Sequence, residues 1–217
     1  MKLYTTIFST LIILCSSTFV IAQDEERGSL KNEIMLTPQY GFINGLRVDY
    51  ERNFKKNALL IAPRIHINTN GENFFSYNDY EEMIGLGLNL GYKVNFIPES
   101  HIMVPYMMFG AYYTWYHLTL EGDSWVPYYY DNIQAQTLVN TEKTIQIHKV
   151  GPDVLVGFQF IPIPQFVMDV SAGIGMRYSI TASENKELVD NQFNSSILDP
   201  GFTGILPVIN FKIGYRF

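Results

Sequence analysis

Eight segments of this 217-residue chain alternate apolar residues with polar or small ones. Successive side chains of a β-strand point to opposite faces, so a period of two residues predicts strands. The clearest example is 83–96, where Ile84, Leu86, Leu88 and Leu90 alternate with glycine and asparagine. The predicted strands are 32–42, 46–54, 58–68, 83–96, 102–118, 144–160, 166–180 and 204–217.

The connections between these strands alternate in length. The connections after strands two, four and six are short, at 55–57, 97–101 and 161–165, and those after strands three, five and seven are long, at 69–82, 119–143 and 181–203. Only the first connection departs from this trend, and its Asn44-Gly45 pair is a strong signal for a tight hairpin. The pattern predicts an all-β fold in which eight antiparallel strands run up and down.

The first 22 residues have the pattern of a secretory signal peptide. Lys2 supplies a positive charge, an apolar run ends at Ile21, and a cut after Ala22 fits the residues around it. A rival interpretation makes Cys15 a lipid-acylation site, but Leu14 before it is too large for that signal. We therefore expect an exported chain, with residues 1–22 removed and residues 23–31 forming a charged periplasmic tail.

The composition narrows the class of protein further. Cleavage would remove the single cysteine, which leaves no disulfide and no thiolate metal site. It would also remove Lys2, which changes the formal net charge from −6 to −7, and no lysine or arginine cluster points to a nucleic-acid partner. No later segment reaches about 18 consecutive apolar residues, so we expect no transmembrane helix. Aromatic residues at 15% and charged residues at 17% are unusual for a soluble secreted domain.

Alternation alone does not decide which face of a barrel points outward, because a soluble lipocalin-type barrel places its apolar face inside. The polar face decides between the two. Many glycines separate its long side chains, which suits a narrow lumen better than a surface in water. The members of this face are Arg47, Asp49, Glu51, Arg64, His66, Asn89, Lys93, Asp153, Asp169, Arg177, Asn210, Lys212 and Arg216.

The end of the chain carries a family resemblance. Phe211, Ile213, Tyr215 and Phe217 share one face of the last strand, and the chain stops on an aromatic residue. This ending resembles the C-terminal barrel-assembly signal of bacterial outer-membrane β-barrels. With the signal peptide, the alternation and the loop lengths, the chain resembles small outer-membrane β-barrel proteins of Bacteroidota and, more distantly, the OmpA-type eight-stranded barrel.

The resemblance implies a transmembrane β-barrel over residues 32–217 in the outer membrane of a Gram-negative cell. Such a barrel contacts lipid and lipopolysaccharide, is folded by the barrel-assembly machinery, and is expected to be a monomer without a cofactor. Short turns then lie in the periplasm and long loops outside. Phenylalanines near the short turns, at 54, 96, 160, 166 and 217, fit an aromatic girdle on the periplasmic side.

The interior of such a barrel is predicted to be a charged plug. Eight strands leave a lumen only wide enough for side chains, and unpaired charges there are costly. The expected network holds six cations and four anions, close enough in number for mutual pairing; a porin-like selective pore is the alternative. Its members are Arg47, Asp49, Glu51, Arg64, Lys93, Asp153, Asp169, Arg177, Lys212 and Arg216.

The long loops are the expected site of function. Acidic and aromatic residues crowd them, and this mixture suits an extracellular ligand such as a glycan or protein, or a divalent cation bridging lipopolysaccharide. A solvated loop surface is the plain alternative. The residues concerned are Glu72, Tyr77, Asp79, Tyr80, Glu81, Glu82, Glu121, Asp123, Trp125, Tyr128, Tyr129, Tyr130, Asp131, Glu142, Glu184, Glu187, Asp190 and Asp199.

Two other functions remain open at this point. An enzyme that acylates or deacylates lipid A would need a nucleophile, a base and an acid at the outer rim. The rim offers His117, His148, Ser179, Ser183, Glu121 and Glu142, which have no recognisable catalytic spacing, so we assign no catalytic residue and no metal site.

A transporter of small hydrophobic molecules by lateral opening is the second alternative. Strand five is apolar on both faces, so the sequence leaves its inward face undecided; in the transporter interpretation Met107, Phe109 and Trp115 lie inside. Prolines 38, 63, 105, 152 and 207 fall in predicted strands, where they mark bulges or strand ends. A change of phase between Ile147 and Val150 predicts a further bulge.

Overall fold

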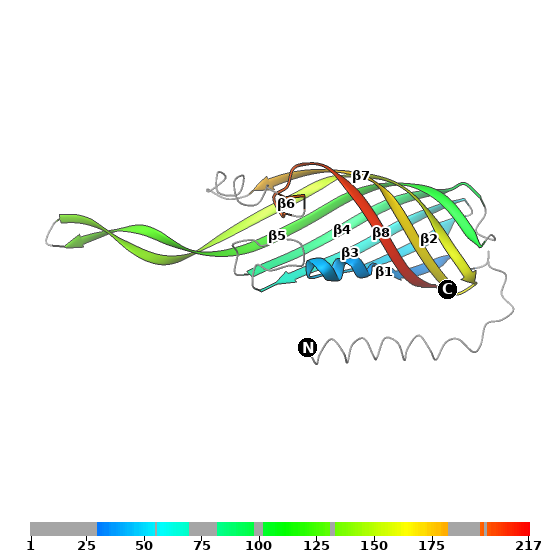
Figure 1. Cartoon of the computed structure of the whole chain (residues 1–217), viewed down its shortest axis with the longest axis horizontal. Helices are drawn as coiled ribbons and strands as arrows, with labels where there is room; N and C mark the ends of the chain where they lie inside the picture. Colours follow the sequence, from blue (N-terminus) through cyan, green and yellow to red (C-terminus); the bar gives the residue numbers. More distant parts are fainter. Residues whose placement is uncertain are drawn as a thin grey trace, which may run out of the picture.

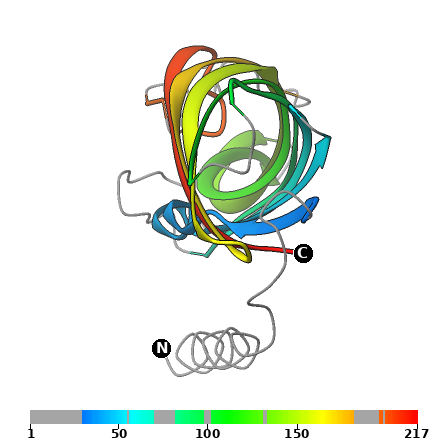
Figure 2. The same ribbon diagram turned by 90° about the vertical axis from the view of Figure 1, so that its right-hand side faces the viewer.

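The computed structural model describes residues 30–54, 56–69, 82–97, 102–130, 133–181, 196–197 and 199–217, without the side chains of 121–126, 128–130, 133–135 and 138–141. Its strands close into a single antiparallel barrel in sequence order, as Figures 1 and 2 show. This confirms the predicted eight-stranded up-and-down fold. The elements are β1 (Asn32–Leu36), η1 (Pro38–Ile43), β2 (Gly45–Phe54), β3 (Asn57–Asn68), β4 (Glu82–Asn95), β5 (Met103–Tyr130), β6 (Ile133–Ile163), β7 (Phe166–Thr181) and β8 (Gly204–Arg216).

The two faces of the sheet are sorted by polarity, with polar residues inside and apolar residues outside. On β4, Leu86, Leu88 and Leu90 are exposed, while Asn89 and Lys93 between and beyond them are buried. The same alternation holds on β3 and β7. A lipocalin-type barrel has the opposite arrangement, so the structure excludes that alternative.

The first predicted strand, 32–42, is wrong in its second half. β1 ends at Leu36, and a 3₁₀ helix, η1, follows from Pro38. Proline has no N–H to donate and a fixed φ, which suits the first turn of a helix better than a central strand. Asn44 then turns the chain into β2 with a φ of 51°, a conformation that asparagine adopts more readily than most residues.

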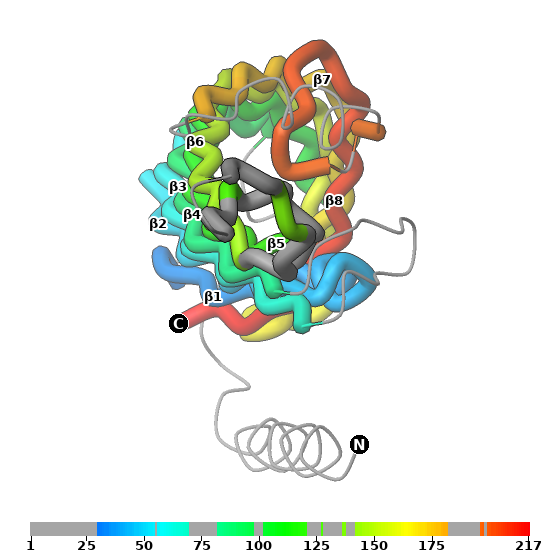
Figure 3. The backbone as a smooth tube through the Cα atoms, turned by 90° about the vertical axis from the view of Figure 1, so that its left-hand side faces the viewer, coloured from blue at the N-terminus to red at the C-terminus, as the bar shows by residue number. Residues whose placement is uncertain are grey.

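Because β1 is short, β8 lacks a strand partner on its β1 side over most of its length, while β7 pairs with it along the other side. β1 pairs with β8 only from Glu33 opposite Arg216 to Leu36 opposite Ile213. Beyond that point η1 lies beside β8, as Figures 1 and 3 show. The Gln39 amide contacts β8 there, because its Nε2 donates to the Ile209 carbonyl at 3.0 Å and its Oε1 accepts from the Phe211 N–H at 3.2 Å. We call this stretch, η1 opposite residues 204–211 of β8, the seam.

The predicted loop 119–143 is also wrong, because most of it is strand. β5 and β6 pair continuously from Met103 opposite Phe160 to Tyr130 opposite Ile133. The hairpin extends far beyond the other strands in Figure 1. Its residues are rich in threonine, valine and tyrosine, which favour strands, and this preference outweighs their acidic, loop-like composition.

Two further predictions about β5 and β6 are corrected by their register. Val104, Tyr106 and Met108 are buried inside the barrel, so Met107, Phe109 and Trp115 face outward rather than inward. The predicted bulge between Ile147 and Val150 is absent, because the pairing of β5 with β6 is unbroken there. What changes along β6 is the inward face itself, which passes from isoleucine to charged residues.

Four of the five prolines singled out in the sequence, Pro63, Pro105, Pro152 and Pro207, lie within strands and leave the register intact. Arg47 opposite Arg64 and Tyr50 opposite Ile61 keep the same offset on either side of Pro63. Val150 opposite Tyr178 and Asp153 opposite Gly175 do the same around Pro152. All four face outward, and the ladder loses local pairs at Pro63 and Pro152 without the inserted residue of a bulge. Predicted bulges at these positions are therefore wrong, and Pro38 marks a strand end.

The interior is filled by alternating apolar and polar layers. One buried apolar cluster contains Met35, Val104, Ile161 and Val167, near the end of the barrel where Phe217 lies. A second lies around Tyr106 and Met108, and a third lies at the base of the hairpin. Glycines make room for the large inward side chains: a Cβ on Gly85 would stand 2.8 Å from the Tyr116 ring. The charged residues lie between these clusters.

Candidate functional site

The ten residues of the expected charge network all lie inside the barrel and are buried. They come from β2, β3, β4, β6, β7 and β8, whose alternation directs them to the common interior. They form two groups. The inner network, nearer the C-terminal end of β8, contains Arg47, Asp49, Glu51, Lys93, Asp169, Lys212 and Arg216. The outer network, nearer the hairpin, contains Arg64, Asp153 and Arg177.

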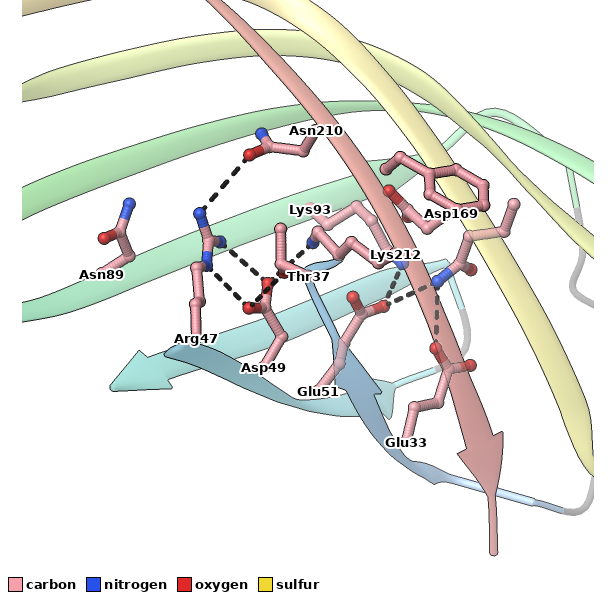
Figure 4. Close-up of polar contacts among 12 residues, drawn as sticks. Glu33, Thr37, Arg47, Asp49, Glu51, Asn89, Lys93, Asp169, Asn210 and Lys212 are labelled. Carbon is pink, nitrogen blue, oxygen red and sulfur yellow. Dashed lines mark hydrogen bonds and ion pairs between the residues drawn. The ribbon is translucent and has the colours of Figure 1, made fainter. Parts of the chain in front are cut away.

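Most carboxylates of the inner network contact a cation, and Figure 4 shows most of the network. Asp49 accepts from Arg47 twice, at 2.7 and 2.8 Å, and forms an ion pair with Lys212 at 2.9 Å. Glu51 pairs with Lys93. A two-point contact between a guanidinium and a carboxylate, as between Arg47 and Asp49, is among the strongest polar interactions in proteins.

Two residues outside the predicted set complete the inner network. Glu33 of β1 forms an ion pair with Arg216 at 2.8 Å. The Gln159 amide donates to Glu33 at 2.9 Å and to Glu51 at 3.5 Å, which bridges the two carboxylates. Both residues follow the strand alternation that located the others, so the same pattern contains the signal for them. Asp169 accepts from the Tyr106 hydroxyl at 2.8 Å.

The outer network differs because an arginine in it has no carboxylate partner. Arg177 forms an ion pair with Asp153 at 2.6 Å. Arg64 is 4% exposed, and within the described part of the chain no carboxylate lies within 4.0 Å of it. Its Nη1 donates to the Tyr40 hydroxyl at 3.2 Å, its Nη2 donates to the Tyr113 carbonyl at 3.2 Å, and its buried Nε has no partner.

Aromatic rings provide the remaining contacts of the outer network. The guanidinium carbons of Arg64 and Arg177 lie 3.6 and 3.9 Å from the centre of the Tyr112 ring. Cations are attracted to the face of an aromatic ring, more strongly where water is excluded. Tyr112 and Tyr40 were not predicted as site residues, since a tyrosine in an apolar segment carries no signal that distinguishes an arginine platform from packing.

Those rim residues considered for catalysis whose side chains the structure describes point in different directions. His148 faces outward, with its Nδ1 3.0 Å from the Tyr113 hydroxyl, and His117 lies outward beside Trp115. Ser179 faces inward and donates to the Phe202 carbonyl at 3.0 Å. Glu142 is exposed, the side chain of Glu121 is not described, and Ser183 lies outside the described residues.

The acidic loop residues fall mostly outside the described residues. This holds for the predicted residues between 70 and 81, for Asp131, and for the predicted residues between 182 and 195. The side chains of Asp123, Trp125 and the three hairpin tyrosines are not described either. Glu82 begins β4 and is exposed. Asp199 is 1% exposed, so its assignment to a solvated loop surface is wrong; its carbonyl accepts from Lys149 at 2.6 Å.

Metal and membrane-helix features are absent from the described ranges. No three of their histidine, cysteine, aspartate and glutamate side chains form a group that could hold a metal ion. None of their helices is both long and apolar enough to cross a membrane.

The comparisons with known proteins leave the chain without an assigned family. No protein-family model matches it, and no curated protein matches it. Among solved structures, the crystal structure of Acinetobacter baumannii CarO2 is similar, with a TM-score of 0.40 and 10% sequence identity, over 87% of this chain and 98% of that chain. A likeness of this degree assigns no function, and the resemblance to Bacteroidota and OmpA-type barrels stays a prediction.

Proposed function

We propose that this protein is an integral outer-membrane β-barrel that presents the β5–β6 hairpin as an interaction surface outside the cell. The observation that carries the membrane assignment is the inverted polarity of the barrel. Apolar side chains such as Leu59, Ile84 and Val156 are about half exposed all around the outside, while the charged residues are buried inside together with three apolar clusters. A closed barrel with this polarity suits lipid, because its strands satisfy one another's backbone groups.

The two ends of the barrel support one orientation in the membrane. The short connections and the C-terminal Phe217 lie at one end, and the hairpin projects from the other. In this proposal the first end faces the periplasm, where Phe54, Phe96 and Phe217 form an exposed aromatic girdle. The hairpin then extends past the lipopolysaccharide. The outward residues Ile213 and Tyr215 contact lipid and complete the signal for barrel assembly.

The filled interior favours a binding role over passage of solutes. The charged side chains of the inner network are at most a few per cent exposed, so ion pairs rather than water occupy the lumen at that level. The proposed role is adhesive or envelope-stabilising, with a glycan or protein as the ligand of the hairpin and with no catalysis. The exported, signal-cleaved chain is proposed to act as a monomer.

Truncation of the hairpin tests this role. A variant in which residues 121–142 are replaced by a two-residue Asn-Gly turn keeps all strands of the barrel itself. We expect it to remain in the outer-membrane fraction and to migrate differently on a gel before and after boiling, as folded barrels do. Binding of cells to surfaces coated with matrix proteins or glycans should fall at least tenfold.

A matched variant separates the tip chemistry from the length of the hairpin. In it Trp125 and Tyr128 to Tyr130 become threonine, which preserves strand preference. The same loss of binding is expected from this variant. Unchanged binding in both variants would contradict the interaction role, and recovery of either protein in the soluble fraction would contradict the membrane assignment.

A further inference from the structure

The seam differs from the rest of the barrel wall. Most of the wall is continuous strand pairing, whereas residues 204–211 of β8 face η1 and the single amide of Gln39 on this side. Alternate residues direct their backbone groups to the same neighbour. Pro207 therefore shares the seam side with Ile209 and Phe211, and its missing N–H removes one donor that would need a partner there.

The side chains of the seam are apolar on its outer side. Ile205 and Ile209 are 67% and 71% exposed, the highest values among the large apolar residues described. Phe42 of η1 is exposed on the other side of the seam. On the inner side, the half-buried Val208 packs against the apolar cluster around Tyr106 and Met108. Apolar side chains thus line both faces of β8 at the seam.

A cation without a counter-ion lies behind the seam. Tyr40 of η1 points inward, and its hydroxyl accepts from Arg64 at 3.2 Å and from Arg47 at 3.4 Å. Arg47 also has the carboxylate of Asp49, but the described residues offer Arg64 only neutral oxygens and the Tyr112 ring. A buried guanidinium without an anion is costly, so an anion that replaced the tyrosine oxygen would be bound strongly.

We propose that the seam is a lateral entry for an amphipathic carboxylate of the fatty-acid type, with its head group bound by Arg64 and its chain along Ile205, Ile209 and Val208. The proposal rests on the membrane assignment above and is independent of the hairpin. Opening requires η1 to move away from β8, which breaks the two Gln39 hydrogen bonds and frees Arg64 from Tyr40. The backbone pairing between β1 and β8, from Glu33 to Leu36, stays intact.

Binding of a fluorescent long-chain fatty carboxylate to the mature chain in detergent micelles tests the head-group contact. We expect Arg64→Gln to weaken binding at least tenfold, since a charge-assisted hydrogen bond contributes on the order of this factor. The matched control is Arg52→Gln, because Arg52 faces outward at the other end of β2 and should leave affinity within twofold. The methyl ester of the ligand should bind weakly to the native chain. Equal binding of ester and carboxylate, or equal loss in both variants, would overturn the proposal.

Tyr40→Phe provides a test in the opposite direction. It removes the oxygen with which the ligand competes, so affinity for the carboxylate should rise about threefold or more. Unchanged or weaker binding would contradict the replacement of Tyr40 by the ligand. Acetate should not displace the long-chain probe at equal concentration; if it does, the site is for small anions and the lateral entry is wrong.

Labelling of the native chain locates the path of the ligand without any substitution. A fatty carboxylate with a diazirine at the end of its chain should crosslink to residues 204–211 or to η1, and peptide mapping detects the adduct. Crosslinks confined to the β4 or β5 face would overturn the entry site. The variant in which residues 121–142 are replaced by the Asn-Gly turn should give the same crosslinks. This result separates the proposal from the role of the hairpin.

Discussion

The inner and outer networks of this barrel contain similar residues but differ in how completely their cations are paired with carboxylates. In the inner network Arg47, Lys93 and Arg216 each contact a carboxylate. In the outer network Arg64 has an aromatic ring and neutral oxygens, one of which belongs to Tyr40 of the short helix η1. Removal of one partner from a buried ion pair is strongly destabilising, whereas an uncompensated charge lowers stability while it remains. The comparison assigns stability to the inner network and ligand recognition to the outer one.

The largest effect is expected from the inner network. Asp49→Asn leaves Arg47 and Lys212 without their shared carboxylate and should lower the free energy of unfolding by about 3–5 kcal/mol. Denaturant titration of the barrel in lipid vesicles measures this. Glu142→Gln at the exposed base of the hairpin is the control and should change stability by less than about 0.5 kcal/mol. A small cost for Asp49→Asn would mean that water screens the inner charges.

A substitution on the outer face tests whether lipid surrounds the barrel that encloses both networks. Leu88→Lys on β4 places a charge where lipid is expected, at a cost of about 2–4 kcal/mol near the bilayer midplane. Leu88→Val is the control, since it keeps the surface apolar. The same titration in vesicles provides the measurement. Equal stability of the two variants would show that this face does not contact lipid.

The seam is expected to respond weakly but locally. Gln39→Ala removes both hydrogen bonds to β8 and should cost about 1–2 kcal/mol. Hydrogen exchange should accelerate at the Phe211 amide and remain slow at the Phe217 amide, which donates to the Asn32 carbonyl on the β1 side of β8. Acceleration along the whole of β8 would mean that β8 opens as one unit, which would remove the distinction between the seam and the β1–β8 ladder.

The smallest change in stability is expected at Arg64 itself. Arg64→Met keeps much of the side-chain volume and removes the uncompensated charge, so stability should stay within about 1 kcal/mol of the native chain or rise. The matched change in the inner network, Arg216→Met, leaves the Glu33 carboxylate without its cation. It should lower the free energy of unfolding several times more than Arg64→Met does. A large loss of stability for Arg64→Met would assign Arg64 a structural role equal to that of Arg216.

Much of the fold and part of the interior follow from the alternation of residues. The inward position of all ten network residues depends only on the period of two, which a strand enforces locally. Their pairing depends on which strands meet, so Glu33 and Gln159 could be placed inside by the same rule but not joined to Glu51 and Arg216. The sequence also located the turns of the Phe217 end, where short connections leave little freedom.

The misplaced regions share a cause, because each depended on an interaction between distant segments. Residues 119–143 have a composition typical of loops, yet pairing with each other makes them strand. Asp199 was assigned to a solvated surface but is buried with its carbonyl on Lys149. On β5 both faces are apolar, so the inward face is identified by contacts with other strands, such as the hydrogen bond from the Tyr106 hydroxyl to Asp169.

The sequence by itself determined the strand period, the number of strands and the polarity of the two faces, because these depend on neighbouring residues along the chain. Only the tertiary structure decided where β1 stops, that Gln39 joins η1 to β8, and that Arg64 lies on Tyr112 without a carboxylate. These contacts join residues far apart in sequence, and their geometry is set by barrel closure. The physical reason is that alternation directs a side chain to a face, whereas register and packing choose its partner.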